Sequence, residues 1–378
     1  MNTTLILIFA AIMTTITSSQ TGKPRARDLG VPFEGSPGPL NAITDVAGIE
    51  VGLTTLISGE GKLEVGKGPV RTGVTAVLPR GRAAADPVMA GWFSLNGNGE
   101  MTGTTWIEES GFLEGPVFIT NTHSVGTVHQ AAIEWTVRNA RNEQAWSLPV
   151  VAETWDGMLN DINGFHVKPE HVFQAIENAR TGAVPEGSVG GGTGMICFQF
   201  KCGTGTSSRR LDARAGGYTV GVLVQANFGL RSQLLVAGAP VGIEIPLPPQ
   251  RAQDDEQGSI IIVIATDAPL MPHQLKRLAR RASLGLARTG STSGNGSGDI
   301  FIAFSTANAG AVRAEGTASV QMLANDRINP IFNAVVQATE EAIVNALVAG
   351  ETMRGINGHE VPGIPHDRLQ EILKKYGR

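Results

Sequence analysis

The sequence predicts a layered fold in which helices and strands alternate, of the α/β or α+β class. Two observations predict it. Short runs rich in Val and Ile alternate along the chain with segments of helical periodicity. The runs at residues 218–226 and 259–265 are so uniformly apolar that both faces of each strand are expected to be buried. Strands of that kind need a helical layer or a second sheet on each side.

Composition permits a large core and argues against some partners. The chain has 378 residues, 42% of them hydrophobic and 17% charged, and its formal net charge is −4. It contains no long Lys/Arg run, which argues against nucleic-acid binding. The basic cluster at residues 276–281 is interpreted as the solvated face of a helix, with Leu275, Leu278 and Ala279 pointing inward. The 48 glycines indicate many tight turns, so loops are expected to carry the chemistry.

The predicted elements follow in chain order. Strands are expected at residues 43–52, 73–78, 116–120, 150–153, 218–226, 259–265 and 299–304. Helices are expected at residues 127–138, 272–286 and 326–349, the first with Thr122 or Ser124 available as its N-cap. Residues 93–105 are dense in Gly, Asn and Thr, which predicts a convoluted loop near a site.

Residues 1–20 resemble a secretory signal peptide. The apolar stretch at residues 5–13 is followed by small and polar residues, and it is too short to span a membrane comfortably. We therefore expect a periplasmic or secreted protein. The alternative is a hydrophobic N-terminal helix of a cytoplasmic protein.

The only two cysteines, Cys197 and Cys202, are not expected to hold a metal. Two sulfurs without matching His or Cys partners do not complete a tetrahedral zinc shell. On a continuous strand they would also lie too far apart to bridge without a turn. We expect free or partly buried thiols.

Ser259 stands at an unusual position for a catalytic serine. A polar, charged linker at residues 250–257 precedes Gly258 and then the apolar strand. Scission after Gly258 would leave Ser259 with a free α-amine, whose ordinary pKa of about 7.7 to 8.0 suits a base on the same residue as the nucleophile. Gly258 would permit the distorted backbone that attack on its carbonyl requires. The alternative is that Gly-Ser before a strand is simply a turn.

Three further elements complete a candidate site. In the loop at residues 294–299, Ser297 and Asp299 alternate, so both can project to one side and orient the nucleophile and its amine. Asn227 ends the strongest strand and offers a neutral donor to an oxyanion. Glu153, also at a strand end, offers a carboxylate to a substrate ammonium. Taken singly, each residue type is more often a cap, a surface residue or part of a structural turn.

Together, six motifs resemble the DmpA-type family of self-processing hydrolases, which includes the L-aminopeptidase D-esterase/amidases and β-aminopeptidases. The motifs lie at residues 43–52, 95–103, 224–227, 258–262, 265–269 and 294–299. The resemblance implies a four-layer αββα sandwich of the DmpA and ornithine-acetyltransferase kind, which is similar to N-terminal-nucleophile hydrolases. It also implies cleavage into an α subunit of residues 21–258 and a β subunit of residues 259–378, which together form one globular domain.

The resemblance also implies a role for each site residue. Ser259 would be the nucleophile and new N-terminus, and Ser297 and Asp299 its hydrogen-bond partners. Asn227 would be the oxyanion donor, and Glu153 would bind the substrate amine.

The sequence departs from the family pattern near the amine-binding residue. Part of the family has a Tyr two residues after the amine-binding Glu, where this chain has Trp155. A phenol-based oxyanion contact is therefore not expected, and Trp155 is expected to shape the substrate pocket. At the second supporting position relatives have either Glu or Asp, and this chain has Asp299.

The predicted function is an exported amide hydrolase that works without metal or organic cofactor. It would release N-terminal α- or β-amino acyl residues from small peptides, amides or esters through an acyl-enzyme. We expect a homo-oligomer of αβ units that binds neither nucleic acid nor membrane. One alternative is an acyltransferase of the ornithine-acetyltransferase kind, whose nucleophile is characteristically Thr. Another is an exported binding protein that holds an anion with the loops at Gly190 and Gly294.

Overall fold

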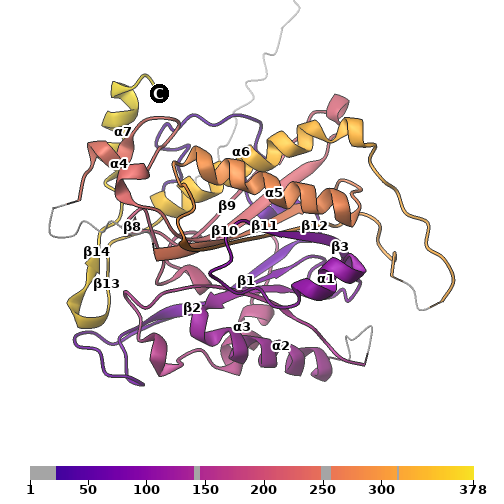
Figure 1. Ribbon diagram of the computed structural model, residues 1–378, viewed down its shortest axis with the longest axis horizontal. Helices are drawn as coiled ribbons and strands as arrows, with labels where there is room; N and C mark the ends of the chain where they lie inside the picture. The colour runs from indigo at the N-terminus through magenta and orange to yellow at the C-terminus, as the bar shows by residue number, and fades with distance from the viewer. Residues whose placement is uncertain (1–22, 140–144, 248–256, 313–314) are drawn as a thin grey trace, which may run out of the picture.

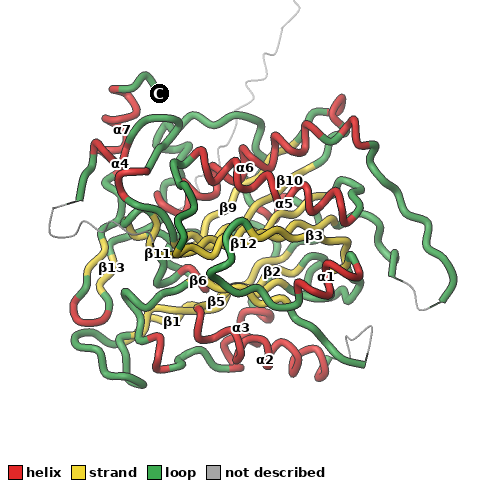
Figure 2. The backbone as a smooth tube through the Cα atoms, in the orientation of Figure 1, coloured by secondary structure: helices red, strands yellow, loops and turns green. Residues whose placement is uncertain are grey.

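Two β-sheets lie face to face in the middle of the molecule, and helices cover the outer face of each (Figure 1). The computed structural model describes residues 23–139, 145–247, 257–312 and 315–378. From one side to the other, the layers are helix, sheet, sheet and helix, as Figure 2 shows by colour. The four-layer αββα sandwich implied by the family resemblance is therefore confirmed.

The larger sheet has six strands in the order β4-β3-β12-β11-β10-β9. Their bounds are Phe112–Leu113 (β4), Val88–Ser94 (β3), Gly296–Ser305 (β12), Gln257–Thr266 (β11), Thr219–Asn227 (β10) and Thr204–Arg210 (β9). Strands β11 and β12 run parallel, whereas the other neighbours are antiparallel. The central strand β11 is rich in Ile and Val, its neighbour β12 carries Ile and Phe, and both are fully buried over most of their length, as apolar residues between two layers favour.

The smaller sheet has four strands in the order β1-β2-β5-β6. Their bounds are Glu50–Ser58 (β1), Val70–Leu78 (β2), Val117–Asn121 (β5) and Val150–Thr154 (β6). Strands β5 and β6 are parallel and end side by side. Two-residue strands form two small ladders outside the main sheets: Ile196–Cys197 (β7) with Phe200–Lys201 (β8), and Met353–Arg354 (β13) with Glu360–Val361 (β14).

Helices cover the two outer faces (Figure 1). Helices α5 (Pro272–Arg288) and α6 (Asn329–Val348) pack on the six-stranded sheet, and α2 (Val125–Arg138) and α3 (Pro169–Glu177) pack on the four-stranded sheet. The other helices are α1 (Thr104–Ser110), α4 (Val241–Glu244) and α7 (His366–Lys375). Within the described segments, none of the helices combines the length and apolarity that a bilayer crossing requires.

Three apolar cores separate the layers, and the alternation of side chains along the central strands assigns each residue to one of them. Ile260 and Ile262 face helices α5 and α6, whereas Ile261 and Val263 face the other sheet. The third core lies between the four-stranded sheet and α2 with α3. Burial on both faces of β11, as predicted from its composition, is confirmed.

Most predicted elements are confirmed with small shifts. The basic cluster at residues 276–281 lies on α5, and Leu275, Leu278 and Ala279 are fully buried. The helix predicted from residue 326 begins at Asn329, after a 3₁₀ turn and next to a proline that fits a first helical turn.

Three sequence predictions were wrong in detail. Ile43–Asp45 is a 3₁₀ turn, and the strand predicted there begins only at Glu50. No side chain caps helix α2, although Ser124 stands at its N-cap position. The second half of the predicted loop at 294–299 is strand, because Gly296, Ser297 and Gly298 pair in register with β11.

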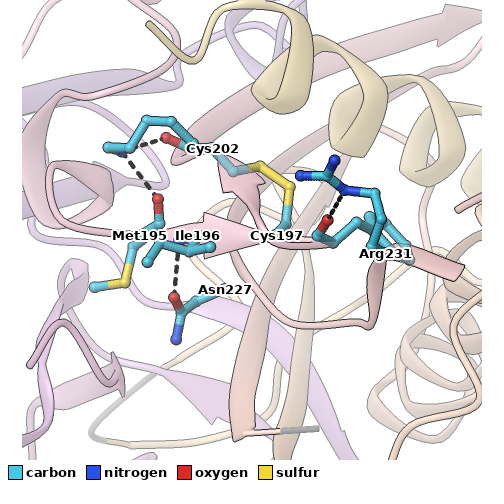
Figure 3. Close-up of a disulfide and its surroundings, with 8 residues drawn as sticks. Met195, Ile196, Cys197, Cys202, Asn227 and Arg231 are labelled. Atoms are coloured by element: carbon cyan, nitrogen blue, oxygen red, sulfur yellow. Dashed lines mark hydrogen bonds between the residues drawn. A yellow bond between two sulfur atoms is a disulfide. The ribbon is translucent and has the colours of Figure 1, made fainter. Parts of the chain in front are cut away.

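The prediction of free cysteines was also wrong. Cys197 and Cys202 form a disulfide with their Cα atoms 5.4 Å apart (Figure 3). The stretch is not one strand, because Phe198 and Gln199 both adopt positive φ and turn the chain back on itself. Two successive residues with positive φ are what a tight two-residue hairpin requires. Two predictions, the signal peptide at residues 1–20 and the charged linker at 250–257, fall wholly or almost wholly outside the described residues.

Candidate active site

Ser259 lies in the middle of the six-stranded sheet, near the beginning of β11. Its antiparallel partner on β10 is Asn227, and its parallel partner on β12 is Gly298. The hydroxyl accepts a hydrogen bond from the Gly298 backbone N–H at 3.1 Å, and the residue is 5% exposed. By strand alternation from Ile261, the Ser259 side chain faces the space between the two sheets.

Gly258 is required by a close approach rather than by backbone distortion. Its φ lies outside the left-handed region, but a Cβ built on it would lie 2.0 Å from the Asn227 carbonyl oxygen. Any larger residue would therefore force β10 and β11 apart beside Ser259. The absence of a side chain allows the bond between Gly258 and Ser259 to lie against Asn227.

The Asn227 side chain stands beside Ser259. Residues directly opposite each other in an antiparallel pair carry their side chains on the same face, about 5 Å apart. The Asn227 Oδ1 accepts from the Ile196 N–H at 2.8 Å, and its Nδ2 donates to the Trp155 carbonyl at 2.8 Å. Asn227 is buried, so its amide dipole is oriented and shielded from bulk solvent.

Ser297 and Asp299 project to one side, as predicted, and are fully buried. The Ser297 hydroxyl donates to Asp299 Oδ1 at 2.7 Å. On β12 the two residues flank Gly298, the partner of Ser259, so their side chains lie on the same face as that of Phe301, toward the helices. In the uncut chain, this pair and the Ser259 hydroxyl therefore lie on opposite faces of neighbouring strands.

The glycine-rich loop at residues 95–103 closes the space above Ser259. A Cβ on Gly298 would lie 2.4 Å from the Asn98 carbonyl oxygen, and a Cβ on Gly99 would lie 3.1 Å from Gly298 Cα. The Asn98 amide also donates to the Gly296 carbonyl at 2.9 Å. Glycine at both positions allows two backbones to touch, which confirms the prediction of a convoluted loop near the site.

Glu153 lies across this glycine contact from Ser259. Its Oε1 accepts from the Glu100 N–H at 3.0 Å and lies 3.2 Å from a Cβ built on Gly99. Its Oε2 accepts a very short hydrogen bond from the Thr122 hydroxyl. The carboxyl is 3% exposed, and burial raises its pKa above the ordinary value in spite of these two donors. The carboxyl is thus buried near Ser259, where a cationic ligand would stabilise its ionised form.

The main chain of Trp155 connects Asn227 with β6, the strand that carries Glu153. Its carbonyl accepts from Asn227, while its side chain is 38% exposed. The next residue, Asp156, is fully buried and accepts from Asn121 at 3.1 Å and Asn160 at 3.0 Å. Burial raises the pKa of Asp156 to about 6 against the effect of these donors. The chain that leaves β6 is therefore anchored immediately after Trp155.

Sequence reasoning missed the residues that act through backbone groups. The N–H groups of Gly298, Ile196 and Glu100 contact Ser259, Asn227 and Glu153, but a backbone donor leaves no residue-type signal. The glycines at 99 and 298 were noticed only as parts of motifs. Among the described residues, no group of three or more His, Cys, Asp or Glu side chains is arranged to hold a metal ion.

Known proteins resemble this chain along most of its length. The chain matches the model of Peptidase family S58 over residues 41–361. It is 59% identical over 369 residues to the beta-peptidyl aminopeptidase BapA of Sphingosinicella microcystinivorans, covering 94% of this chain and 93% of the relative. It is 50% identical over 387 residues to the protein of the same name from Sphingosinicella xenopeptidilytica, covering 98% and 96%.

A solved structure shows the same fold at high identity. The L-aminopeptidase D-Ala-esterase/amidase of Ochrobactrum anthropi superposes with a TM-score of 0.87 at 50% identity, covering 94% of this chain and 99% of that chain. That protein is described as a prototype for the serine aminopeptidases and a variant of the Ntn-hydrolase fold. The predicted relation to N-terminal-nucleophile hydrolases is therefore confirmed.

Proposed function

Because this chain belongs to peptidase family S58 and is a serine aminopeptidase of the Ntn-hydrolase kind, we propose that Ser259 is its nucleophile and is released by cleavage after Gly258. The observation that supports this most is the position of Ser259. It stands in a central strand between the Asn227 amide and the Gly298 N–H, with Gly258 pressed against the Asn227 carbonyl.

Self-cleavage would proceed by an acyl shift. The Ser259 hydroxyl oxygen attacks the carbonyl carbon of Gly258, its proton passes to the Ser259 nitrogen, and the peptide bond breaks to leave an ester. Water then hydrolyses the ester and releases the Gly258 carboxylate. The products are a free α-amine and a free hydroxyl on Ser259.

The same groups would then act on substrate. The Ser259 hydroxyl attacks the substrate carbonyl, and the α-amine takes the hydroxyl proton and delivers it to the leaving amine. The Asn227 Nδ2 would donate to the developing oxyanion. Once the link to Gly258 is cut, Ser259 can rotate toward the buried Ser297–Asp299 pair, which would orient its hydroxyl and amine.

Glu153 would bind the free amino group of the substrate. It is a buried carboxyl whose two neutral donors do not offset the cost of burial, so a substrate ammonium would supply the missing positive charge. Its place across the Gly99–Gly298 contact would set the amino group close to the scissile carbonyl. This explains why an aminopeptidase would act at the first residue only.

The substrates would be small peptides, amides or esters with a free N-terminal amine. The two relatives named beta-peptidyl aminopeptidase favour β-amino acyl groups among them. Membership in a peptidase family favours transfer to water over the acyltransferase and binding-protein alternatives. Turnover of a panel of α-L-, α-D- and β-aminoacyl p-nitroanilides would separate these preferences.

Three further features are part of the proposal. The segments 21–258 and 259–378 would remain associated as subunits of one sandwich, because β11 lies between β10 and β12. The αβ units would form a homo-oligomer. The protein would be exported, and the Cys197–Cys202 disulfide supports this because disulfides persist in oxidising compartments.

The test is the identity of the smaller fragment. On a denaturing gel the purified protein should give two bands, and Edman sequencing of the smaller one should begin Ser-Ile-Ile-Ile. Ser259→Ala should stay uncut and lose activity by at least about 10⁴-fold. Ser207→Ala is the control, because it removes a buried hydrogen bond to Ala338 on the helix side of the sheet and should still mature. A single uncut chain with full peptidase activity would refute the proposal.

A further inference from the structure

The side-chain amide of Asn227 is held at both ends in one orientation. The Ile196 N–H donates to Oδ1, and Nδ2 donates to the Trp155 carbonyl, each at 2.8 Å. A flipped amide would place its NH₂ group against the Ile196 N–H and its oxygen against the Trp155 oxygen. Both contacts would then be lost. The amide nitrogen carries two hydrogens, and Trp155 takes one of them.

The donor on the Oδ1 side belongs to the hairpin of residues 195–202. Ile196 pairs with Lys201 across β7 and β8, and the next pair is Cys197 with Phe200. The disulfide joins Cys197, the residue after the donor, to Cys202 on the returning strand (Figure 3). The covalent closure of the hairpin is therefore one residue away from the N–H that contacts Asn227.

Two buried basic side chains secure the rest of the hairpin. The Lys201 side chain is fully buried, which lowers its pKa to about 7, and its amine donates to the carbonyls of Met195 at 2.9 Å and Cys202 at 2.7 Å. The Arg231 guanidinium donates to the Phe198 carbonyl at 2.9 Å and lies over the Phe200 ring. Because buried hydrogen bonds are costly to leave unmade and Arg231 follows β10 in the chain, its contacts hold the hairpin in one place relative to β10.

We propose that this disulfide-closed hairpin positions the catalytic amide. Through the Ile196 N–H it holds Asn227 with its nitrogen directed to the oxyanion that forms at Ser259. Ile196, Cys197 and Cys202 are thus positioning residues that act through Asn227. The inference rests on the oxyanion role proposed for Asn227 above.

The experiment compares mature enzyme with and without the disulfide, each in the presence and absence of the Asn227 side chain. Cys197→Ser/Cys202→Ser should lower kcat by about 2- to 12-fold, the range of one net hydrogen bond, with KM unchanged. In the Asn227→Ala background the same cysteine changes should have no further effect on kcat, because coupled residues are not additive. Rates are normalised to the cleaved fraction. Ser207→Ala reports what lost stability alone does to kcat.

Ile196→Pro provides a second route if the double cysteine variant does not fold. It removes the N–H while the disulfide stays, and Ile196→Val keeps the N–H as its matched control. Ile196→Pro should reproduce the kcat loss, and Ile196→Val should not.

The outcomes distinguish a failure of this positioning role from a failure of the oxyanion role proposed for Asn227. An unchanged kcat after loss of the disulfide or of the Ile196 N–H overturns this inference alone, provided that Asn227→Ala is impaired. An equal loss in the Asn227→Ala background also overturns it, because the effect would then not pass through Asn227. If Asn227→Ala itself keeps native kcat, the oxyanion role fails and this inference fails with it.

Discussion

The end of the candidate site at Ser259 and the end at Glu153 are built in different ways. Ser259 and Asn227 are neighbours in one sheet, where ladder pairing sets their distance. Glu153 belongs to β6 in the other sheet, which packs against β11, and the contact of Gly99 with Gly298 lies between the two sheets. The chemistry therefore depends on strand register, whereas recognition depends on how a loop packs between two layers. The first should resist small changes in packing better than the second.

The largest effect is expected at the end of the site where Asn227 pairs with Ser259. Asn227→Ala should lower kcat by about 10²- to 10³-fold, because one oxyanion donor is lost, and it should also slow maturation if the same amide serves self-cleavage. Turnover must therefore be normalised to the cleaved fraction. A normalised kcat within a few-fold of native, together with a lower melting temperature, would make Asn227 a structural residue.

A smaller effect is expected at Glu153, the residue proposed to bind the substrate amine. Glu153→Gln should raise KM for substrates with a free amine by about 10- to 100-fold, the value of a hydrogen bond to a charged group, while self-cleavage persists. N-acylated substrates, which carry no ammonium, should be poor for the native enzyme. Equal turnover of N-acylated and free-amine substrates by the native enzyme would contradict this role.

The pH dependence of recognition follows from the buried position of Glu153. Only the ionised carboxylate pairs with an ammonium, and burial raises its pKa in the free enzyme. As pH falls through this raised pKa, kcat/KM for amine substrates should decrease, and the decrease should begin at a higher pH than it would for a Glu with an ordinary pKa. Glu153→Gln should lack this component of the acidic limb, which a comparison of the two pH profiles measures.

The last prediction concerns the stability of the fold rather than activity, at the segment that follows Trp155. Asp156 follows Trp155, and its pKa is raised to about 6 in the folded protein from 3.8. Because the folded state holds the proton more tightly, the stabilisation is full below about pH 4 and is lost as pH rises through about 6. The loss is up to about 3 kcal/mol. Denaturant unfolding between pH 4 and 7.5 should show a falling free energy of unfolding that is flatter in Asp156→Asn. Equal slopes would contradict the prediction.

Much of the site could be predicted because its signals are local in the sequence. A charged linker, then Gly258 and Ser259, then an apolar strand indicates a nucleophile at a strand start. Asn227 and Glu153 were identified as polar residues at the ends of apolar strands, which lie at the edges of a buried sheet. Period-two alternation predicted that Ser297 and Asp299 share a side, and their hydrogen bond confirms it.

The cysteines show where local reasoning failed. The prediction of free thiols assumed a continuous strand, but Phe198 and Gln199 adopt positive φ. Neither residue is a glycine, so nothing in their types indicated a turn. The buried contacts of Lys201 and Arg231 with the hairpin carbonyls stabilise this conformation, and those contacts exist only once the chain has folded.

The sequence by itself determined the class of fold, the candidate nucleophile and the polar residues available to it, because hydrophobic periodicity and residue chemistry are properties of short segments. The tertiary structure decided which of these residues meet. It set Asn227 opposite Ser259, placed Ser297 and Asp299 on the far face of β12, and brought Glu153 to the site past Gly99. Register and the distance between layers are set by contacts between segments far apart in the chain, and a local pattern carries no information about them.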